Sequence, residues 1–502
     1  MAGIVQFERV LSPLAGGVFW IAAALLLLWA APAFAGEATI DPKIVQAVGR
    51  LTYGPAPGTL EQAAAMGLEA FVAAQLAPER LPEPPELERA LAGLPSQQMD
   101  TVRLFREYGP PADDGKNAPD AMRRTFDRAD VVALEAAKAR LLRAILSPRQ
   151  LAERMTEFWC EHFSLGPKKG LAHLWVGSFE REAVRPYALG KFLDLLAATA
   201  MHPAMLIARD NWKNVVHREG GTATKEALDL GYATLLINFQ TLGQGGPQKP
   251  ADIQALARIL TGWRVGAARA DSDTGGFYFD VELHDPADKV LLGQPVKGTG
   301  LGEGAAALRI LAEHPATARN VCRKLAVYFL TDEPPAGLVA RMAETFGQTG
   351  GEIREVLRTL FSSAEFYDAK YRGGRIKSPL RQAVSAVRAL GAPPTDTAAL
   401  AGALAGLGQP LFAAEGPEGY PAAAAPWQKP EALPRRVSFA GDLAAGRVPG
   451  LGGVGPTAKD RVAALAETLG PTLSAPVRQA AEKAGGSNGV GLILASPDFL
   501  QY

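Results

Sequence analysis

Residues 130–163 read DVVALEAAKARLLRAILSPRQLAERMTEFWCEHF, and this stretch indicates the kind of fold that the chain adopts. Apolar side chains recur every three or four residues up to Leu146, which predicts an amphipathic helix with one buried face. Ser147 and Pro148 interrupt the pattern. The pair is typical of a helix start, because serine caps a helix N-terminus and proline fits the first helical position. A second helix, ending near Phe163, is therefore expected to follow.

The same helix-start signal recurs along the chain, where Asp, Ser or His before Pro precedes an apolar run of helical period. The further occurrences are Asp41-Pro42, His202-Pro203, His314-Pro315, Ser378-Pro379 and Ser496-Pro497. Residues 277–292 instead alternate at period two on both sides of a turn at residues 285–288, which predicts a β-hairpin. The sequence therefore predicts a mainly α protein, a multi-helix bundle with one small β-hairpin and long Gly/Pro-rich loops.

The amino-acid composition limits the classes of function that the protein can have. The chain has 502 residues, of which 48% are apolar, and this is enough for a large core. Lys and Arg together number 52, as do Asp and Glu, so the net charge is zero. Without a basic field the sequence excludes nucleic-acid binding as the main function.

The N-terminus predicts export. Arg9 precedes an apolar run over residues 18–31, and Ala33-Phe34-Ala35 fits a small-x-small cleavage site. We therefore predict a signal peptide over residues 1–35 and a periplasmic or secreted mature chain; an uncleaved membrane anchor is the alternative. No other run reaches the roughly 18 apolar residues of a transmembrane helix, so none is expected after cleavage. Cys160 and Cys322 lie in apolar helical patterns typical of buried thiols, with a mutual disulfide as the alternative.

Beyond the signal peptide we predict one helical domain over residues 36–499. Its parts are N-terminal helices and a loop (36–128), a central helical core (129–265), a β-hairpin insertion (266–300), C-terminal helices (301–395), a long loop region (396–460) and terminal helices (461–502). The long loop region is rich in Gly and Pro, yet it contains Phe412, Tyr420, Trp427 and Phe439. Aromatic side chains of this size usually pin a loop onto a surface.

Six motifs in a fixed order carry a family resemblance. They are E-F-W-x-E-H-F at residues 157–163, L-G-K-F-L-D-L-L at 189–196, H-P-A-M-L at 202–206, A-R-I-L-T-G-W at 257–263, H-D-x-x-x-K at 284–289 and H-P-A-T-A at 314–318. From about Arg50 to Phe499 the chain resembles the bacterial "domain of unknown function 1800" family. The resemblance implies an exported protein whose gene often neighbours that of an exported sulfatase-like protein. It implies no reaction, so the cofactors stay unknown.

One motif departs from the family. The family's most polar motif reads N-E-N-Y-A-R-E-L-x-E-L-H-T-L-G, and residues 229–243 read D-L-G-Y-A-T-L-L-I-N-F-Q-T-L-G. The family's charged or histidine positions are uncharged here, namely Leu230, Thr234, Leu235, Asn238 and Gln240. General acid–base catalysis needs a titratable group, and metal binding needs anionic or imidazole donors. Any site to which this helix contributes is therefore expected to be depleted.

The candidate catalytic residues are His162, His284 and Asp285, because imidazole and carboxylate groups carry protons in general acid–base catalysis. The candidate binding residues are Glu157, Trp159, His202, Asp210, Asn211 and Trp263. We expect one cleft to be lined by His162, His202, Asp210, Asn211, Trp263, His284 and Asp285. No H-E-x-x-H, G-x-S-x-G or Cys–His ligand spacing occurs, so no metal ligands are assigned.

Each candidate also has a structural alternative. His162 follows an aromatic run and could be a hydrogen-bonded core histidine. His202 precedes a proline, as a helix N-cap does. Asp210 and Asn211 are typical of a helix end, and Asp285 before a proline is an ordinary turn residue.

Two function classes follow. The first is an exported, non-catalytic binding or accessory protein for another exported protein, such as a sulfatase-like protein, or for an envelope polymer. The depleted motif favours this class. The second is a periplasmic or secreted hydrolase that uses a His/Asp cleft, with or without a metal ion. The sequence leaves open whether the protein is an enzyme.

Overall fold

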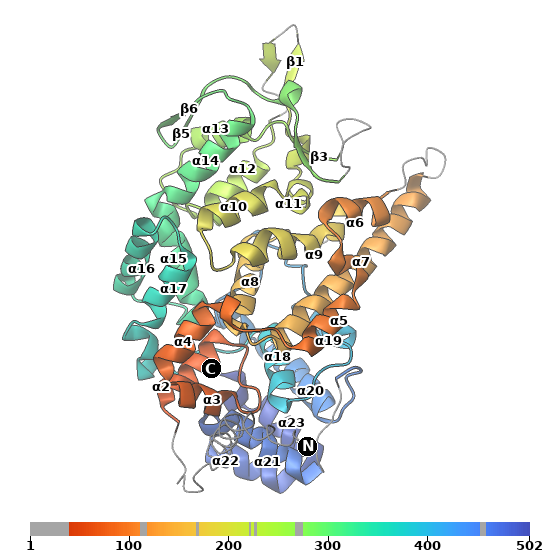
Figure 1. Cartoon of the computed structure of the whole chain (residues 1–502), viewed down its shortest axis with the longest axis vertical. Coiled ribbons are helices and arrows are strands. Elements are labelled where there is room, and N and C mark those ends of the chain that lie inside the picture. The colour runs from red at the N-terminus through yellow and green to blue at the C-terminus, as the bar shows by residue number, and fades with distance from the viewer. Residues whose placement is uncertain are drawn as a thin grey trace, which may run out of the picture. The chain divides into compact units, whose positions relative to one another are not determined.

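The computed structural model describes residues 40–110, 118–166, 170–219, 222–224, 228–266, 275–451 and 458–502. The predicted signal peptide lies outside these residues. Asp41–Tyr502 form one compact unit (Figure 1). Helices dominate the described part of the chain, which confirms the prediction of a mainly α protein.

The first part of the unit is built from helices alone. They are α2 (Pro42–Leu51), α3 (Thr59–Met66), α4 (Leu68–Leu76), α5 (Pro85–Ala92), α6 (Thr101–Tyr108), α7 (Ala118–Leu146) and α8 (Gln150–His162). Helix α7 begins twelve residues before the amphipathic run at residue 130 that predicted it. The intervening Ala, Met and Arg residues favour a helix, and this preference extends it through sequence that is too polar to signal burial.

Two π-helices interrupt the middle of the chain. They are η4 (Phe179–Val184) and η8 (Leu236–Gln240), and each continues a short α-helix: α9 (Val176–Ser178) leads into η4, and α12 (Gly231–Leu235) leads into η8. The neighbouring helices are α10 (Phe192–Met201), α11 (Pro203–Ala208) and α13 (Pro250–Ile259). π-Helices are rare and are frequent at functional sites.

In the part of the chain that the structure describes, the strands form three two-stranded antiparallel sheets. They pair β1 (His217–Glu219) with β2 (Thr222–Thr224), β3 (Trp263–Val265) with β4 (Phe277–Phe279), and β5 (Lys289–Leu291) with β6 (Gln294–Val296). The predicted hairpin over residues 277–292 is therefore wrong in its pairing. Leu292 and Gly293 both have positive φ, at 51° and 78°, as a tight two-residue hairpin turn requires. That turn folds β5 back on β6 and leaves β4 to pair with β3.

The C-terminal part returns to helices. They are α14 (Leu301–Glu313), α15 (Pro315–Phe329), α16 (Ala336–Gln348), α17 (Ile353–Phe361), α18 (Pro379–Leu390), α19 (Ala398–Gly406), α20 (Leu433–Ala444), α21 (Ala458–Leu469), α22 (Ala475–Ala484), α23 (Gly486–Ala495) and α24 (Pro497–Leu500). Helices α18 to α24 share one apolar core, to which α7 contributes Leu141 (Figure 1). Helices α19 and α20 lie inside the region predicted as a long loop. Phe439 and Leu443 of α20 pack in the core, so the Gly/Pro content concealed an amphipathic helix.

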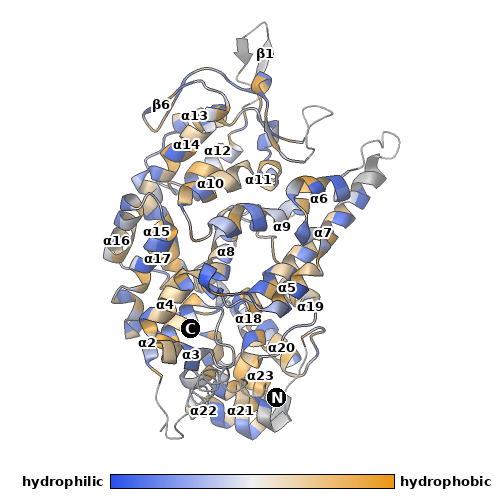
Figure 2. Cartoon of the chain, viewed as in Figure 1, coloured by the Kyte–Doolittle hydropathy of each residue, from blue (hydrophilic) through white to orange (hydrophobic). Residues whose placement is uncertain are grey.

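The predicted helix starts at Asp41, His202, His314, Ser378 and Ser496 are confirmed, because each side chain accepts a backbone N–H from the first turn of its helix. Polar and apolar residues mix along most helices, as expected where one face is buried (Figure 2). Among the described helices, none has both the length and the apolar character to cross a membrane. Cys160 and Cys322 are both free thiols.

Candidate functional site

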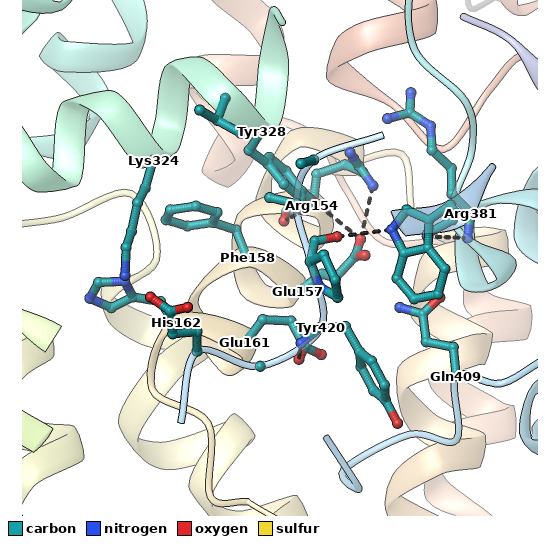
Figure 3. A pocket seen from close by; sticks show the side chains of 18 of the residues that line it. Arg154, Glu157, Phe158, Glu161, His162, Lys324, Tyr328, Arg381, Gln409 and Tyr420 are labelled. Atoms are coloured by element: carbon teal, nitrogen blue, oxygen red, sulfur yellow. Dashed lines mark hydrogen bonds and ion pairs between the residues drawn. The ribbon is translucent and has the colours of Figure 1, made fainter. Parts of the chain in front are cut away.

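Helix α8 presents five side chains to one cavity of about 290 Å³ (Figure 3). They are Arg154, Glu157, Phe158, Glu161 and His162, and their spacing places them on one face of the helix. The apolar period buries the opposite face, where Trp159 is fully enclosed. The local sequence thus aims a mixed set of charged and aromatic groups at the cavity.

Distant segments complete the walls. Helix α15 contributes Lys324 and Tyr328, and α18 contributes Arg381. The region predicted as a long loop contributes Tyr420 and Trp427, whose rings lie 6.2 Å apart. The expectation that these aromatics hold the loop against a surface agrees with their position on this wall.

Glu157 is held by three hydrogen bonds inside the unit. Its Oε2 atom accepts hydrogen bonds from the hydroxyl of Tyr53 at 2.8 Å, the hydroxyl of Tyr328 at 2.9 Å and Nη1 of Arg154 at 2.9 Å. Burial, with the Glu157 carboxylate, raises the pKa of Tyr53 far above its usual range. Burial raises the pKa of Tyr328 as well, so both hydroxyls stay protonated donors and the Oε2 atom of Glu157 is fully used by internal bonds.

His162 keeps one free lone pair. Its Nε2 atom lies 3.0 Å from the carbonyl oxygen of Gln240, which only accepts, so Nε2 carries the proton. Burial, and then the ammonium of Lys324, lowers the pKa of His162 well below its usual range. The ring is therefore neutral. Its Nδ1 atom is a buried acceptor without a partner among the described residues.

Glu161 is fitted against the loop that closes the cavity. The backbone N–H of Tyr420 donates to its Oε2 at 2.8 Å. Burial raises the pKa of Glu161 to about 7 despite that hydrogen bond. Gly419 has φ +71°, and a Cβ there would lie 2.5 Å from the Glu161 carbonyl oxygen. Only glycine lets the loop approach the helix this closely.

The segment with the depleted motif borders this cavity. The carbonyl of Gln240, the last residue of η8, accepts from His162, and the carbonyl of Phe239 accepts from Lys324 Nζ at 2.9 Å. Gln240 stands where the family resemblance predicts a histidine. Its Nε2 atom is buried and has no partner in the part of the chain described. The lost histidine position is thus next to His162.

The other candidates on the central helices do not line this cavity. Trp159 donates from Nε1 to the carbonyl of Ala188 at 2.9 Å, in the core. His202 accepts at Nδ1 from the backbone of Ala204 and caps α11, and burial, with Arg181 nearby, lowers its pKa to about 3. This is the structural alternative that the sequence offered for it.

Asp210 and Asn211 follow α11 and begin the short 3-10 helix η6 (Asn211–Lys213). Asp210 has φ 56° and pairs with Lys213 at 3.1 Å. Asn211 is buried and donates from Nδ2 to the carbonyl of Leu260 at 3.3 Å. Both occupy the turn role that such residues commonly have.

His284, Asp285 and Trp263 lie in a second buried cluster beside the β-strands. His284 Nε2 lies 2.9 Å from Glu303 Oε1, and its Nδ1 lies 2.9 Å from the carbonyl of Thr261. Glu303 also binds Lys289 at 2.5 Å, and Asp285 pairs with Arg258 at 2.6 Å. Trp263 packs on α14, where a Cβ on Gly304 would meet its ring at 2.2 Å. These bonds tie the strands to the helices.

Of the nine candidates, Glu157 and His162 therefore share the cavity. Its lining also includes Glu161, a possible orienting partner of His162 on the sequence, and Arg154, Lys324, Arg381, Tyr420 and Tyr502, which the sequence did not single out for the site. The helical spacing of Arg154 and Glu161 from Glu157 was a usable signal, whereas Arg381 and Tyr502 are remote in the sequence. Within the described residues, no three His, Cys, Asp or Glu side chains are grouped as a metal ion would require.

The family is shown by a sequence comparison. A family model described as "Protein of unknown function (DUF1800)" matches residues 46–501. The chain belongs to this family. The residues that match the DUF1800 model include α8, the depleted segment and the loop that closes the cavity. Comparisons with curated proteins and with solved structures gave no match.

Proposed function

We propose that this DUF1800 protein is exported and acts as a non-catalytic binding or accessory protein for another exported protein or an envelope component. The cavity beside α8 is the proposed binding site. Export is supported by the sequence of residues 1–35. The binding role is supported by the internal bonds that hold the two carboxylates of α8 in the cavity, Glu157 and Glu161.

The observation that carries the proposal is the state of the cavity's proton-carrying groups. Glu157 accepts three hydrogen bonds at one oxygen, and Glu161 is fixed by the backbone of Tyr420. Next to His162, the position where the family has a histidine is Gln240, which cannot transfer protons. A general acid–base pair needs two groups that exchange protons near the working pH and reach the substrate. The cavity therefore suits holding a ligand better than transforming it.

One observation favours the second class, a hydrolase. Glu161 has a pKa of about 7 and lines the same cavity as His162, which has a free Nδ1 acceptor. Perturbed groups in a cavity are typical of active sites. On this alternative, His162 takes a proton from water while Glu161 protonates the leaving group.

The experiment compares binding with turnover in the same purified protein. Protein isolated from the exported fraction is analysed by native mass spectrometry for a bound molecule or partner, and is then incubated with ester, glycoside, sulfate-ester and phosphate-ester reporters. We expect a retained ligand, released unchanged, and no turnover above the blank.

Matched variants make the comparison decisive. Glu161→Gln and His162→Gln remove the proton-carrying groups, and Glu69→Gln on exposed α4 is the control. Turnover by the wild type that Glu161→Gln abolishes and Glu69→Gln preserves, at unchanged melting temperature, would overturn the binding proposal. An empty protein that captures neither an exported protein nor an envelope component would overturn it as well.

A further inference from the structure

One end of the cavity rests on a buried cluster of cationic side chains. The cationic cluster consists of Arg50, Arg154, Arg375, Lys377 and Arg381, each at most 5% exposed. They come from α2, α8, α18 and the segment before α18, which are far apart in the sequence. In the described part of the chain two carboxylates pair with them: Glu157 binds Arg154, and Asp332 binds Arg375 at 2.9 Å. Two carboxylates thus pair with five basic side chains, of which Lys377 has its pKa lowered well below the usual range by burial and then by Arg381.

Arg381 lines the cavity and has hydrogen-bond donors that no described residue accepts from. Its Nη2 atom donates to the backbone carbonyls of Gly49 and Thr52, the latter at 3.1 Å. Its Nε and Nη1 atoms are buried and have no partner among the described residues, and neither has Nε of Arg154. A buried guanidinium left without an anion is costly, because both solvation and pairing are lost.

The charge imbalance acts on the ionisation of the neighbouring groups. Burial, and then the charge of Arg154, lowers the pKa of Arg381 to about 9. Tyr502 also lines the cavity and stacks on Arg381, with its ring centroid 3.3 Å from the guanidinium carbon. Although burial alone raises the pKa of this phenol, Arg381, Arg375 and Arg154 lower it to about 7. The phenol of Tyr502 therefore ionises more readily than usual, and its phenolate places negative charge beside Arg381.

The two ends of the cavity differ. Lys324 and His162 lie together at one end, and Arg154 and Arg381 lie toward the other (Figure 3). Phe158 and Val327 line the space between them with apolar surface. A volume of about 290 Å³ leaves room for a group larger than a single water molecule beside the two guanidiniums.

We infer that the Arg154–Arg381 end of the cavity binds an anionic oxygen group of the ligand: a phosphate, a sulfate or a carboxylate. The planar guanidinium fork matches such groups and is weakly hydrated, so it binds them well in buried sites. The inference rests on the proposed function, since it names the class of ligand for the same cavity.

The test uses Tyr502 as a built-in reporter in the wild-type protein. An anion beside the guanidiniums disfavours the phenolate, so binding raises the pKa of Tyr502. At pH 8 we expect phosphate, sulfate or acetate to reduce the tyrosinate absorbance in a saturable way, with the same midpoint by calorimetry. Sodium chloride at equal ionic strength separates binding from screening. The rank of the three anions identifies the group that fits.

Variants assign the signal to residues. Tyr502→Phe should lose the absorbance change and keep the heat of binding. Arg381→Ala should weaken binding at least tenfold, whereas Arg435→Ala, at an exposed position, should leave it unchanged. Arg381→Lys is the substitute if the alanine variant does not fold, and it should weaken binding because it loses the fork.

The inference is overturned if the folded wild-type protein shows neither saturable heat nor an absorbance change with any of the three anions. That outcome leaves the proposed function standing if native mass spectrometry still finds a retained neutral ligand or a partner. Turnover of a reporter has the opposite effect, because it overturns the non-catalytic proposal and leaves the anion site intact.

Discussion

Replacing Glu157 by alanine should destabilise the whole unit, because one carboxylate oxygen neutralises Arg154 and accepts from two buried tyrosines. Arg154 is 2% exposed, and after the substitution its charge faces no carboxylate. Breaking a buried ion pair by removing one partner costs about 3–5 kcal/mol. Tyr328 keeps a second acceptor, the carbonyl of Arg154 at 3.1 Å, so only Tyr53 loses its hydroxyl partner outright. We therefore expect a loss of about 3 kcal/mol or more, from the lower end of that range upward.

The assay is thermal unfolding followed by circular dichroism. With an unfolding entropy of about 2.1 cal/mol/K per residue, a unit of this size shifts its melting temperature by about 1 °C for each kcal/mol. Glu157→Ala should thus lower the Tm by about 3–5 °C. Glu157→Gln keeps the shape and an acceptor but loses the charge. Its Tm should therefore lie between those of Glu157→Ala and the wild type. Glu69→Ala, on exposed α4, is the matched control. A Tm for Glu157→Ala equal to that of the control would refute the assigned role.

Three further predictions concern other parts of the fold. Gly419→Ala should displace the loop from Glu161 and weaken ligand binding. Gly408→Ala is the control, because Gly408 has a similar φ of +87° but nothing within 4 Å, and it should lower stability without affecting binding. Equal losses of binding in the two variants would contradict a role for the close approach of Gly419 to Glu161. His202 has a folded pKa of about 3, so the unfolded chain binds its proton first as the pH falls. The free energy of unfolding should therefore fall from about pH 6.5 toward pH 3, by at most about 1.4 kcal/mol per pH unit. His202→Gln should flatten this slope in unfolding titrations. An unchanged slope would show that His202 does not cause the pH dependence. Gly304→Ala should cost about 1–3 kcal/mol by overpacking Trp263. Gly347→Ala, in open space on helix α16, should instead stabilise by up to about 1 kcal/mol, because alanine favours a helix. Calorimetry that finds the same effect for both variants would show that the Trp263 ring can move aside.

The helices were readable from the sequence because their signals are local. Asp41, Ser378 and Ser496 each cap the helix that the sequence assigned to them, since a cap and an apolar period are properties of a few adjacent residues. The strand pairing was not readable in the same way. The period-two pattern at residues 277–292 gives the faces of strands but not their partners, and the turn at Leu292 and Gly293 settled the pairing instead.

For the same reason, only part of the candidate site could be predicted from the sequence. His162 and Glu157 stand on one helix with Arg154 and Glu161, so periodicity links the four. Arg381 and Tyr502 join them through packing between segments more than 200 residues apart, which no local pattern encodes. The histidines at positions 202 and 284 illustrate the converse. Their residue type indicated chemistry, yet their hydrogen bonds show a helix cap and a tie between strands and α14.

The π-helix η8 has a consequence for how length changes act on this protein. A π-turn holds one residue more than an α-turn, so deleting a single residue between Leu236 and Gln240 would restore regular α-helix. The residues on either side would keep their relative orientation, because the bulge disappears together with its extra residue. The change would be local to the bulge, whose last residue, Gln240, accepts from His162 through its carbonyl. A lost codon there would therefore disturb the wall of the pocket beside His162 while leaving the fold in place.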